Sequence, residues 1–239
     1  MSQYTIYPLK VGSIVRQKSN MAFMKDPGKT MEMPLIMWYL TDGERRVLVD
    51  TGGTAPDHRY QPYTRTKEQE PLAALLSLGV RPGEITDVIL THLHWDHAGN
   101  NQLFPNAVFY VQKAELQYAA APIVLHKNSY DHKVIFNTEY KVLNGDCGLF
   151  GGISVILTPG HSPGSQSVVV DTSRGKYVIV GDLVGLYECF ESEPMACSSY
   201  HTDLVSYYES LDKIKALGYR ILPSHEPLIF EHGSYPPHI

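Results

Sequence analysis

Residues 91–100 read THLHWDHAGN, and this stretch is the most informative part of the 239-residue chain. Three histidines and an aspartate fall within six positions: His92, His94, Asp96 and His97. They follow the segment 85–90, whose apolar residues Val88, Ile89 and Leu90 predict a buried β-strand. Alternate residues of an extended segment point the same way, so His92 and His94 can face one side, whereas Asp96 and His97 lie where the chain turns. Clustered imidazole and carboxylate ligands favour zinc or another divalent ion over a chance group of surface histidines.

Ligand-type residues follow three other predicted strands. His161 comes after the strand predicted at 153–157, Asp182 after 176–180 and His225 after 220–222. Taken alone, each residue has a simple interpretation as part of a turn. Agreement between four strand ends in one chain is harder to attribute to chance, and it favours a shared metal site.

The rest of the pattern is that of an α/β protein. Strands are predicted at 4–15, 36–40, 46–49, 107–111 and 167–171, and helices at 70–78, 113–119 and from Thr202, as N-cap, to Leu217. The segment 16–33 is polar and irregular but contains Met21, Phe23, Met24, Met31 and Met33, which suit either adaptable apolar contacts or loop packing. Because no linker separates the halves, we expect one domain over 1–239, with two β-sheets facing each other and helices outside.

Composition excludes several classes of function. Twenty basic against twenty-five acidic residues leave a net charge of −5, so nucleic acid and anionic membranes are not expected partners. No apolar run approaches the roughly 18 residues that span a bilayer, and residues 1–8 do not resemble a signal peptide. Three cysteines without CxxC spacing favour free thiols in a reducing compartment. These features predict a cytoplasmic protein, as a monomer or homodimer.

The order HxHxDH, then His, Asp and His resembles that of the metallo-β-lactamase superfamily, as does VDTG at 49–52. The resemblance covers about 35–224. It implies an αββα sandwich, in which two mixed β-sheets have helices on their outer faces, and a site for two divalent ions, with zinc preferred and iron, manganese or cobalt as alternatives. It also implies that one metal is held by His92, His94 and His161, the other by Asp96, His97 and His225, and that Asp182 bridges them.

Within the superfamily the chain is similar to the N-acyl-homoserine lactonases, in residues 34–40, 47–52 and 95–101. Those enzymes usually carry an active-site tyrosine three residues after the bridging aspartate. This chain has Gly185 there, and the nearest tyrosine is Tyr187. Tyr187 is therefore a candidate catalytic donor, with packing as the alternative. Its substitution by phenylalanine is expected to slow lactone hydrolysis at least about tenfold if it donates to the developing oxyanion.

These residues together predict a hydrolase for a small-molecule lactone or ester. Two divalent ions lower the pKa of a shared water, so that hydroxide can attack the carbonyl, and Asp96 is expected to pass a proton to the leaving alkoxide. Asp50 is expected to orient a ligand imidazole through its ring N–H, to form a turn before Gly52, or to do both.

Other readings of the site remain. The same residues also suit hydrolysis of a thioester, phosphoester or amide. A flavodiiron-type oxygen reductase is disfavoured because it normally has a carboxylate in place of His94, and a non-catalytic metal scaffold is disfavoured because all seven ligands are present. The remaining histidines are expected at the surface or in loops: His58, His126, His132, His201, His232 and His238.

Overall fold

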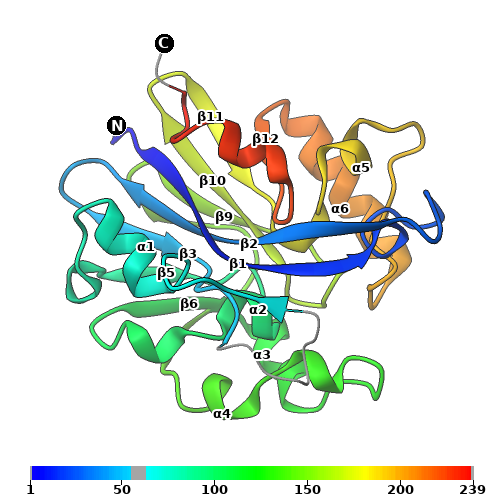
Figure 1. Ribbon diagram of the computed structural model, residues 1–239, viewed down its shortest axis with the longest axis horizontal. Coiled ribbons are helices and arrows are strands. Elements are labelled where there is room, and N and C mark those ends of the chain that lie inside the picture. Colours follow the sequence, from blue (N-terminus) through cyan, green and yellow to red (C-terminus); the bar gives the residue numbers. More distant parts are fainter. Residues whose placement is uncertain (1, 55–62, 238–239) are drawn as a thin grey trace.

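A computed structural model describes residues 2–54 and 63–237 of the chain. It shows two β-sheets stacked face to face, with helices on both outer sides (Figure 1). His58 and His238 lie outside the described residues. The predicted αββα sandwich is confirmed.

The first sheet has the strand order β4-β1-β2-β3-β5-β6-β7. Its strands are β1 (Thr5–Gln17), β2 (Thr30–Thr41), β3 (Arg46–Val49), β4 (Tyr63–Thr64), β5 (Asp87–Ile89), β6 (Val108–Gln112) and β7 (Tyr140–Leu143). The second sheet has the order β12-β11-β10-β9-β8. Its strands are β8 (Cys147–Phe150), β9 (Ile153–Leu157), β10 (Gln166–Thr172), β11 (Gly175–Ile179) and β12 (Arg220–Leu222). Both sheets are mixed, because β3, β5, β6 and β7 pair in parallel, as do β11 and β12, whereas the other strands pair antiparallel.

The helices are α1 (Pro71–Ser77), α2 (Trp95–Ala98), α3 (Lys113–Ala120), α4 (His132–Ile135), α5 (Tyr187–Glu191) and α6 (Leu204–Leu217). No helix of the described residues is both long and apolar enough to cross a membrane. Asp203, not Thr202, is the N-cap of α6, because its carboxylate accepts from the backbone N–H of Val205 and Ser206. The helix ends at Gly218, whose φ of 63° is the left-handed conformation that glycine adopts readily.

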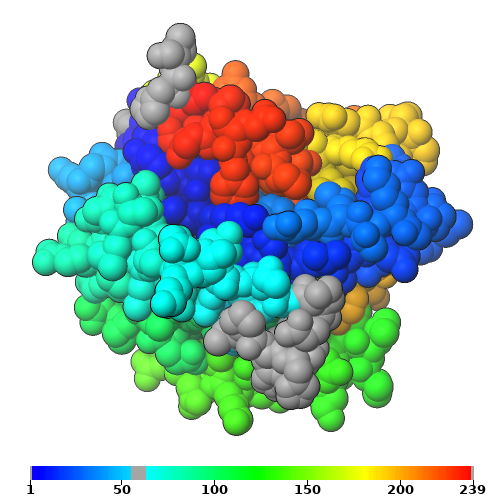
Figure 2. Space-filling view, viewed as in Figure 1, coloured from blue at the N-terminus to red at the C-terminus, as the bar shows by residue number. Residues whose placement is uncertain are grey.

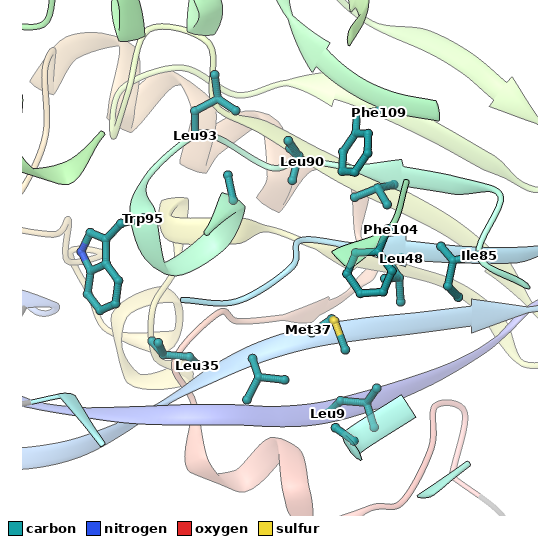
Figure 3. Close-up of a cluster of buried hydrophobic side chains, with 14 of the residues drawn as sticks. Leu9, Leu35, Met37, Leu48, Ile85, Leu90, Leu93, Trp95, Phe104 and Phe109 are labelled. Carbon is teal, nitrogen blue, oxygen red and sulfur yellow. The ribbon is translucent and has the colours of Figure 1, made fainter. Parts of the chain in front are cut away.

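Three apolar layers hold the sandwich together. One lies between the first sheet and α1, α2 and α3, a second between the sheets, and a third under α5 and α6. Figure 3 shows Met37, Leu48 and Phe109, from three strands of the first sheet, pointing into the first layer. Ile89 points the opposite way, into the layer between the sheets. A strand with both faces buried explains the consecutive apolar residues 88–90.

The segment 16–33 differs from the expected loop. β1 and β2 continue as an antiparallel pair as far as Gln17 and Thr30, because backbone hydrogen bonds pair strands whatever their side chains. Met33 is fully buried, whereas Met24 at the tip is 77% exposed. Short elements without a clear apolar period, among them β7, β8, α4 and α5, were not predicted from the sequence.

The end of the described chain packs on its beginning. Ile6 and Tyr235 exchange two backbone hydrogen bonds of 2.8 and 2.7 Å. The C-terminal segment, red in Figure 2, accordingly lies against the blue N-terminal strand. The three cysteines are free, as predicted.

Candidate metal centre

The turns that follow β5, β9, β11 and β12 bring all seven predicted ligands together. They form two groups, and within each group the potential ligand atoms lie within 4.8 Å of one another. The first group is His92, His94, His161 and Asp182, and the second is Asp96, His97 and His225. These are the two sets that the resemblance implies, with Asp182 grouped beside the three histidines.

Asp182 lies between the two groups and turns one carboxylate oxygen toward each. Its Oδ1 lies 3.0 Å from Nε2 of His97 and 3.2 Å from Nε2 of His225. Its Oδ2 lies 3.4 Å from Nε2 of His161 and 4.0 Å from Nε2 of His92. A carboxylate in this position can bridge two cations.

The donor atoms of the centre fit divalent cations. Nε2 of His92 is buried and has no hydrogen-bond partner among the described residues, and Nε2 of His97 and of His225 both face one oxygen, Oδ1 of Asp182. Buried polar atoms without partners are costly, and native structures contain few of them. Nδ1 of His94 lies 3.1 Å from Nε2 of His161, so both ring nitrogens are directed at the same point. Nitrogen and carboxylate ligands that converge in this way are the donor set of zinc and related ions.

The electrostatics of the centre favour its metal-binding form. Burial and the neighbouring histidines hold the pKa of His92 and of His94 well below the ordinary value, so both imidazoles are neutral. Burial raises the pKa of Asp182, but His97, His225 and His161 outweigh it and hold the pKa well below the ordinary value. Asp182 is therefore an ionised carboxylate.

His97 has the opposite shift. Burial lowers its pKa, but the carboxylates of Asp182, Asp50 and Asp96 outweigh burial and hold the pKa well above the ordinary value. A cation must compete with a proton for Nε2 of this residue, so metal binding here releases a proton.

Asp50 performs both of the roles considered from the sequence. Its φ of 61° places it in the left-handed region that Asp and Asn tolerate, as the turn after β3 requires. Its carboxylate accepts hydrogen bonds from the backbone N–H of Thr91 at 2.7 Å, from Oγ1 of Thr91 at 2.8 Å and from Nδ1 of His97 at 2.8 Å. Because a carboxylate only accepts, Nδ1 of His97 keeps its proton, and the proton that a metal displaces is the one on Nε2.

Backbone carbonyls orient two other histidines. Nδ1 of His161 donates to the carbonyl of Tyr200 at 2.8 Å, and Nδ1 of His225 donates to the carbonyl of Pro34 at 2.9 Å. Both rings thereby present Nε2 to the centre. Sequence reasoning missed these contacts because every residue carries a carbonyl, so no residue type signals its use.

A cavity of about 170 Å³ opens beside the centre. Four candidate ligands line it: His94, Asp96, His161 and Asp182. The other lining residues are a mixture of polar and apolar side chains: Ile14, Arg16, Asn20, Met21, Trp95, Ser129, Ser199 and Tyr200. Trp95 packs edge-on against Tyr63, with ring centroids 5.2 Å apart. The cavity gives a small polar molecule access to the centre.

The structure places Tyr187 away from this cavity, in agreement with the packing alternative. Its ring packs against the apolar layer between the sheets, and its hydroxyl lies 3.5 Å from the carbonyl of Ile221. It lines a separate cavity of about 600 Å³. The backbone N–H of Tyr187 donates to the Glu226 carboxylate at 2.9 Å, at the start of α5.

Met21 fills the space where a side chain at residue 185 would begin. A Cβ on Gly185 would lie 2.8 Å from Sδ of Met21, and Met21 itself lines the cavity beside the centre. The departure at Gly185 is therefore matched by a side chain from the β1–β2 hairpin.

Known proteins match this chain in sequence and in fold over nearly its full length. The N-acyl homoserine lactonase of Bacillus thuringiensis is 30% identical, over 96% of this chain and 93% of that protein. The N-acyl homoserine lactonase AttM of Rhizobium radiobacter is 26% identical, with 95% of each chain covered. A solved N-acyl homoserine lactone hydrolase, with N-hexanoyl-L-homoserine bound at its catalytic metal centre, superposes with a TM-score of 0.84 at 27% identity, over 100% of both chains.

The family profile of the metallo-beta-lactamase superfamily matches residues 36–225. That range runs from β2 to His225 and includes every turn that supplies the centre. The chain belongs to the metallo-beta-lactamase superfamily.

Proposed function

We propose that this protein is a metal-dependent lactonase that opens the cyclic ester of N-acyl homoserine lactones. The observation that carries the proposal is the position of Asp182, with one oxygen toward each ligand group. The lactonases among its relatives, matched over nearly their full length, support the choice of substrate. Such an activity would make the protein a quorum-quenching enzyme.

We assign the ligands as two sets that share a bridge. His92, His94 and His161 would hold one cation, Asp96, His97 and His225 the other, and Asp182 both. Two bound divalent cations would supply Lewis acidity at the carbonyl and lower the pKa of water. Zinc is preferred because nitrogen ligands predominate, with iron, manganese or cobalt as alternatives.

Asp96 is the proposed proton donor. It lines the cavity, and its side chain is 12% exposed, whereas the side chains of His92 and His97 are 0% and 4% exposed. A carboxyl group at this edge can pass a proton to the alkoxide that leaves when the ring opens.

We further propose that residues 1–239 form a single domain, which acts in the cytoplasm as a monomer or homodimer.

A substrate panel tests the function. Protein loaded with zinc is incubated separately with N-hexanoyl homoserine lactone, a thioester and a phosphodiester, and acid release is followed, with thiol release as a second readout for the thioester. We expect turnover of the lactone above the others, and its loss in Asp182→Ala. Efficient cleavage of the thioester or phosphodiester with no attack on the lactone would instead favour another hydrolase of the same fold.

A further inference from the structure

Glu115 is a fully buried carboxylate that the proposed chemistry does not use. It lies in the first turn of α3 and is 0% exposed. Burial raises its pKa, and the four hydrogen bonds around it, which favour the charged form, offset only part of this shift. A fully buried carboxyl group with four hydrogen-bond donors around it requires an explanation beyond helix packing.

Each oxygen of Glu115 accepts hydrogen bonds from one of the two turns that carry the three histidines of the first ligand group. Oε1 accepts from the backbone N–H of Leu93 at 3.0 Å and from the Tyr130 hydroxyl at 3.1 Å. Leu93 stands between His92 and His94, and the ring of Tyr130 packs edge-on against His94 with centroids 4.8 Å apart. The first oxygen therefore holds the turn after β5.

The second oxygen holds the turn after β9. Oε2 accepts from Oγ of Ser162 at 2.5 Å and from the backbone N–H of Gly164 at 3.2 Å. Ser162 directly follows His161. Gly164 lies so close that a Cβ there would collide with the backbone of Glu115, which fixes the turn against α3.

We propose that Glu115 is a positioning residue that sets the separation of His94 and His161, and thereby the affinity of the three-histidine group for a divalent cation. The proposal rests on the metal centre assigned above. His94 and His161 come from different sheets and turn their ligand nitrogens to within 3.1 Å of each other. One carboxylate joins both turns, so it connects the two ligands directly across the sandwich.

The chemistry requires a carboxylate at this position. Each oxygen faces one backbone N–H, from Leu93 or from Gly164, and a backbone N–H cannot accept. Glutamine would turn its –NH₂ toward one of these groups and leave that turn without an acceptor. Glu115→Gln therefore changes the positioning with almost no change in shape.

The experiment measures Co²⁺ binding in two backgrounds, each with one ligand group disabled. In His225→Ala, the remaining strong site is the three-histidine group, and we expect Glu115→Gln to weaken Co²⁺ binding there about 10–100-fold, as loss of a residue that orients a ligand does. In His94→Ala, the remaining site is the group around His97, and we expect Glu115→Gln to leave its affinity unchanged. Visible absorption of bound Co²⁺ gives the affinities without any substrate.

Two matched variants separate positioning from general loss of stability. Gln112→Leu removes a buried carboxamide at the N-cap of α3 that bonds Gly145 at 2.9 and 3.0 Å and Gln166 at 2.9 Å, but neither ligand turn. It should lower the melting temperature and leave Co²⁺ affinity unchanged. Ser162→Ala removes one of two donors to Oε2 and should weaken the three-histidine group alone, to a smaller extent, even if Glu115→Gln does not fold.

The outcomes distinguish this proposal from the lactonase assignment. Equal losses of Co²⁺ affinity in the two backgrounds, or parent affinity in folded Glu115→Gln and in Ser162→Ala, would overturn the positioning role and leave the lactonase untouched. Selective loss at the three-histidine group, in a protein that hydrolyses no lactone, would support the role of Glu115 and refute only the substrate.

Discussion

Asp50→Asn is expected to weaken divalent-cation binding at the group formed by Asp96, His97 and His225 by about 10–100-fold. Asparagine tolerates the φ of 61° at this position, so the turn itself should survive. The change replaces the oxygen that accepts from Nδ1 of His97 at 2.8 Å by an –NH₂ group, or else breaks the contacts with Thr91. An –NH₂ group there stabilises the tautomer of His97 that carries its proton on Nε2, and that tautomer cannot bind a metal.

The magnitude follows from the hydrogen bond that is lost. A hydrogen bond to a charged group contributes about 1.5–3 kcal/mol, and a difference of about 1.4 kcal/mol is tenfold in an equilibrium constant. Loss of the contact between Asp50 and His97 thus corresponds to roughly one to two powers of ten in affinity.

A Co²⁺ titration in the His94→Ala background measures this affinity. Thr91→Val is the matched control, because it removes the hydroxyl that donates to Asp50 at 2.8 Å and keeps the bond between Asp50 and His97. We expect it to cost much less affinity than Asp50→Asn. If Asp50→Asn bound Co²⁺ as tightly as its parent, Asp50 would be a turn residue only and the tautomer argument would be refuted.

Four further results are expected. Metal analysis should find about two divalent ions per chain. Asp182→Ala should lower this metal content and remove nearly all turnover, because no carboxylate would then lie between the two groups. An active protein without metal would contradict both expectations. Tyr187→Phe should leave kcat/KM unchanged, because its hydroxyl lies by the carbonyl of Ile221, and a tenfold loss with an unchanged melting temperature would restore Tyr187 to the active site. Asp203→Ala should lower the melting temperature by removing the N-cap of α6. Hydrogen bonds from Ser206 and Val205 hold the pKa of Asp203 below its ordinary value. The stability that Asp203 contributes is therefore present above its pKa in the unfolded chain, and it is lost as the pH falls through its pKa in the folded protein. A difference in melting temperature between Asp203→Ala and the parent that persisted below this pH range would contradict this origin.

Local sequence patterns were sufficient to predict the sandwich and the candidate ligands. The apolar residues 88–90, shortly before HLHWDH, predicted a buried strand ending in a cluster of ligand-type residues. Such features can be read from a short window, because side-chain chemistry and strand periodicity act between near neighbours in the chain. His161, Asp182 and His225 were found in the same way, each just after its own strand.

Features that depend on distant segments could not be predicted in this way. The full length of the β1–β2 hairpin comes from pairing between backbones, which side-chain periodicity does not report. Tyr187 was expected near the centre because it is close to Asp182 in sequence, but α5 and its contact with Glu226 turn it the other way.

The sequence by itself determined which residues supply the nitrogen and oxygen atoms of the centre, because ligand chemistry belongs to the residue type. Only the tertiary structure decided which atom of each ligand faces inward. Asp50 is 47 residues from His97, and the carbonyl of Pro34 is 191 residues from His225. Glu115 joins Leu93 to Gly164 although 22 and 49 residues separate it from them. Such contacts arise from the packing of both sheets against their helices, and packing is a property of the whole chain, which no short stretch of sequence contains.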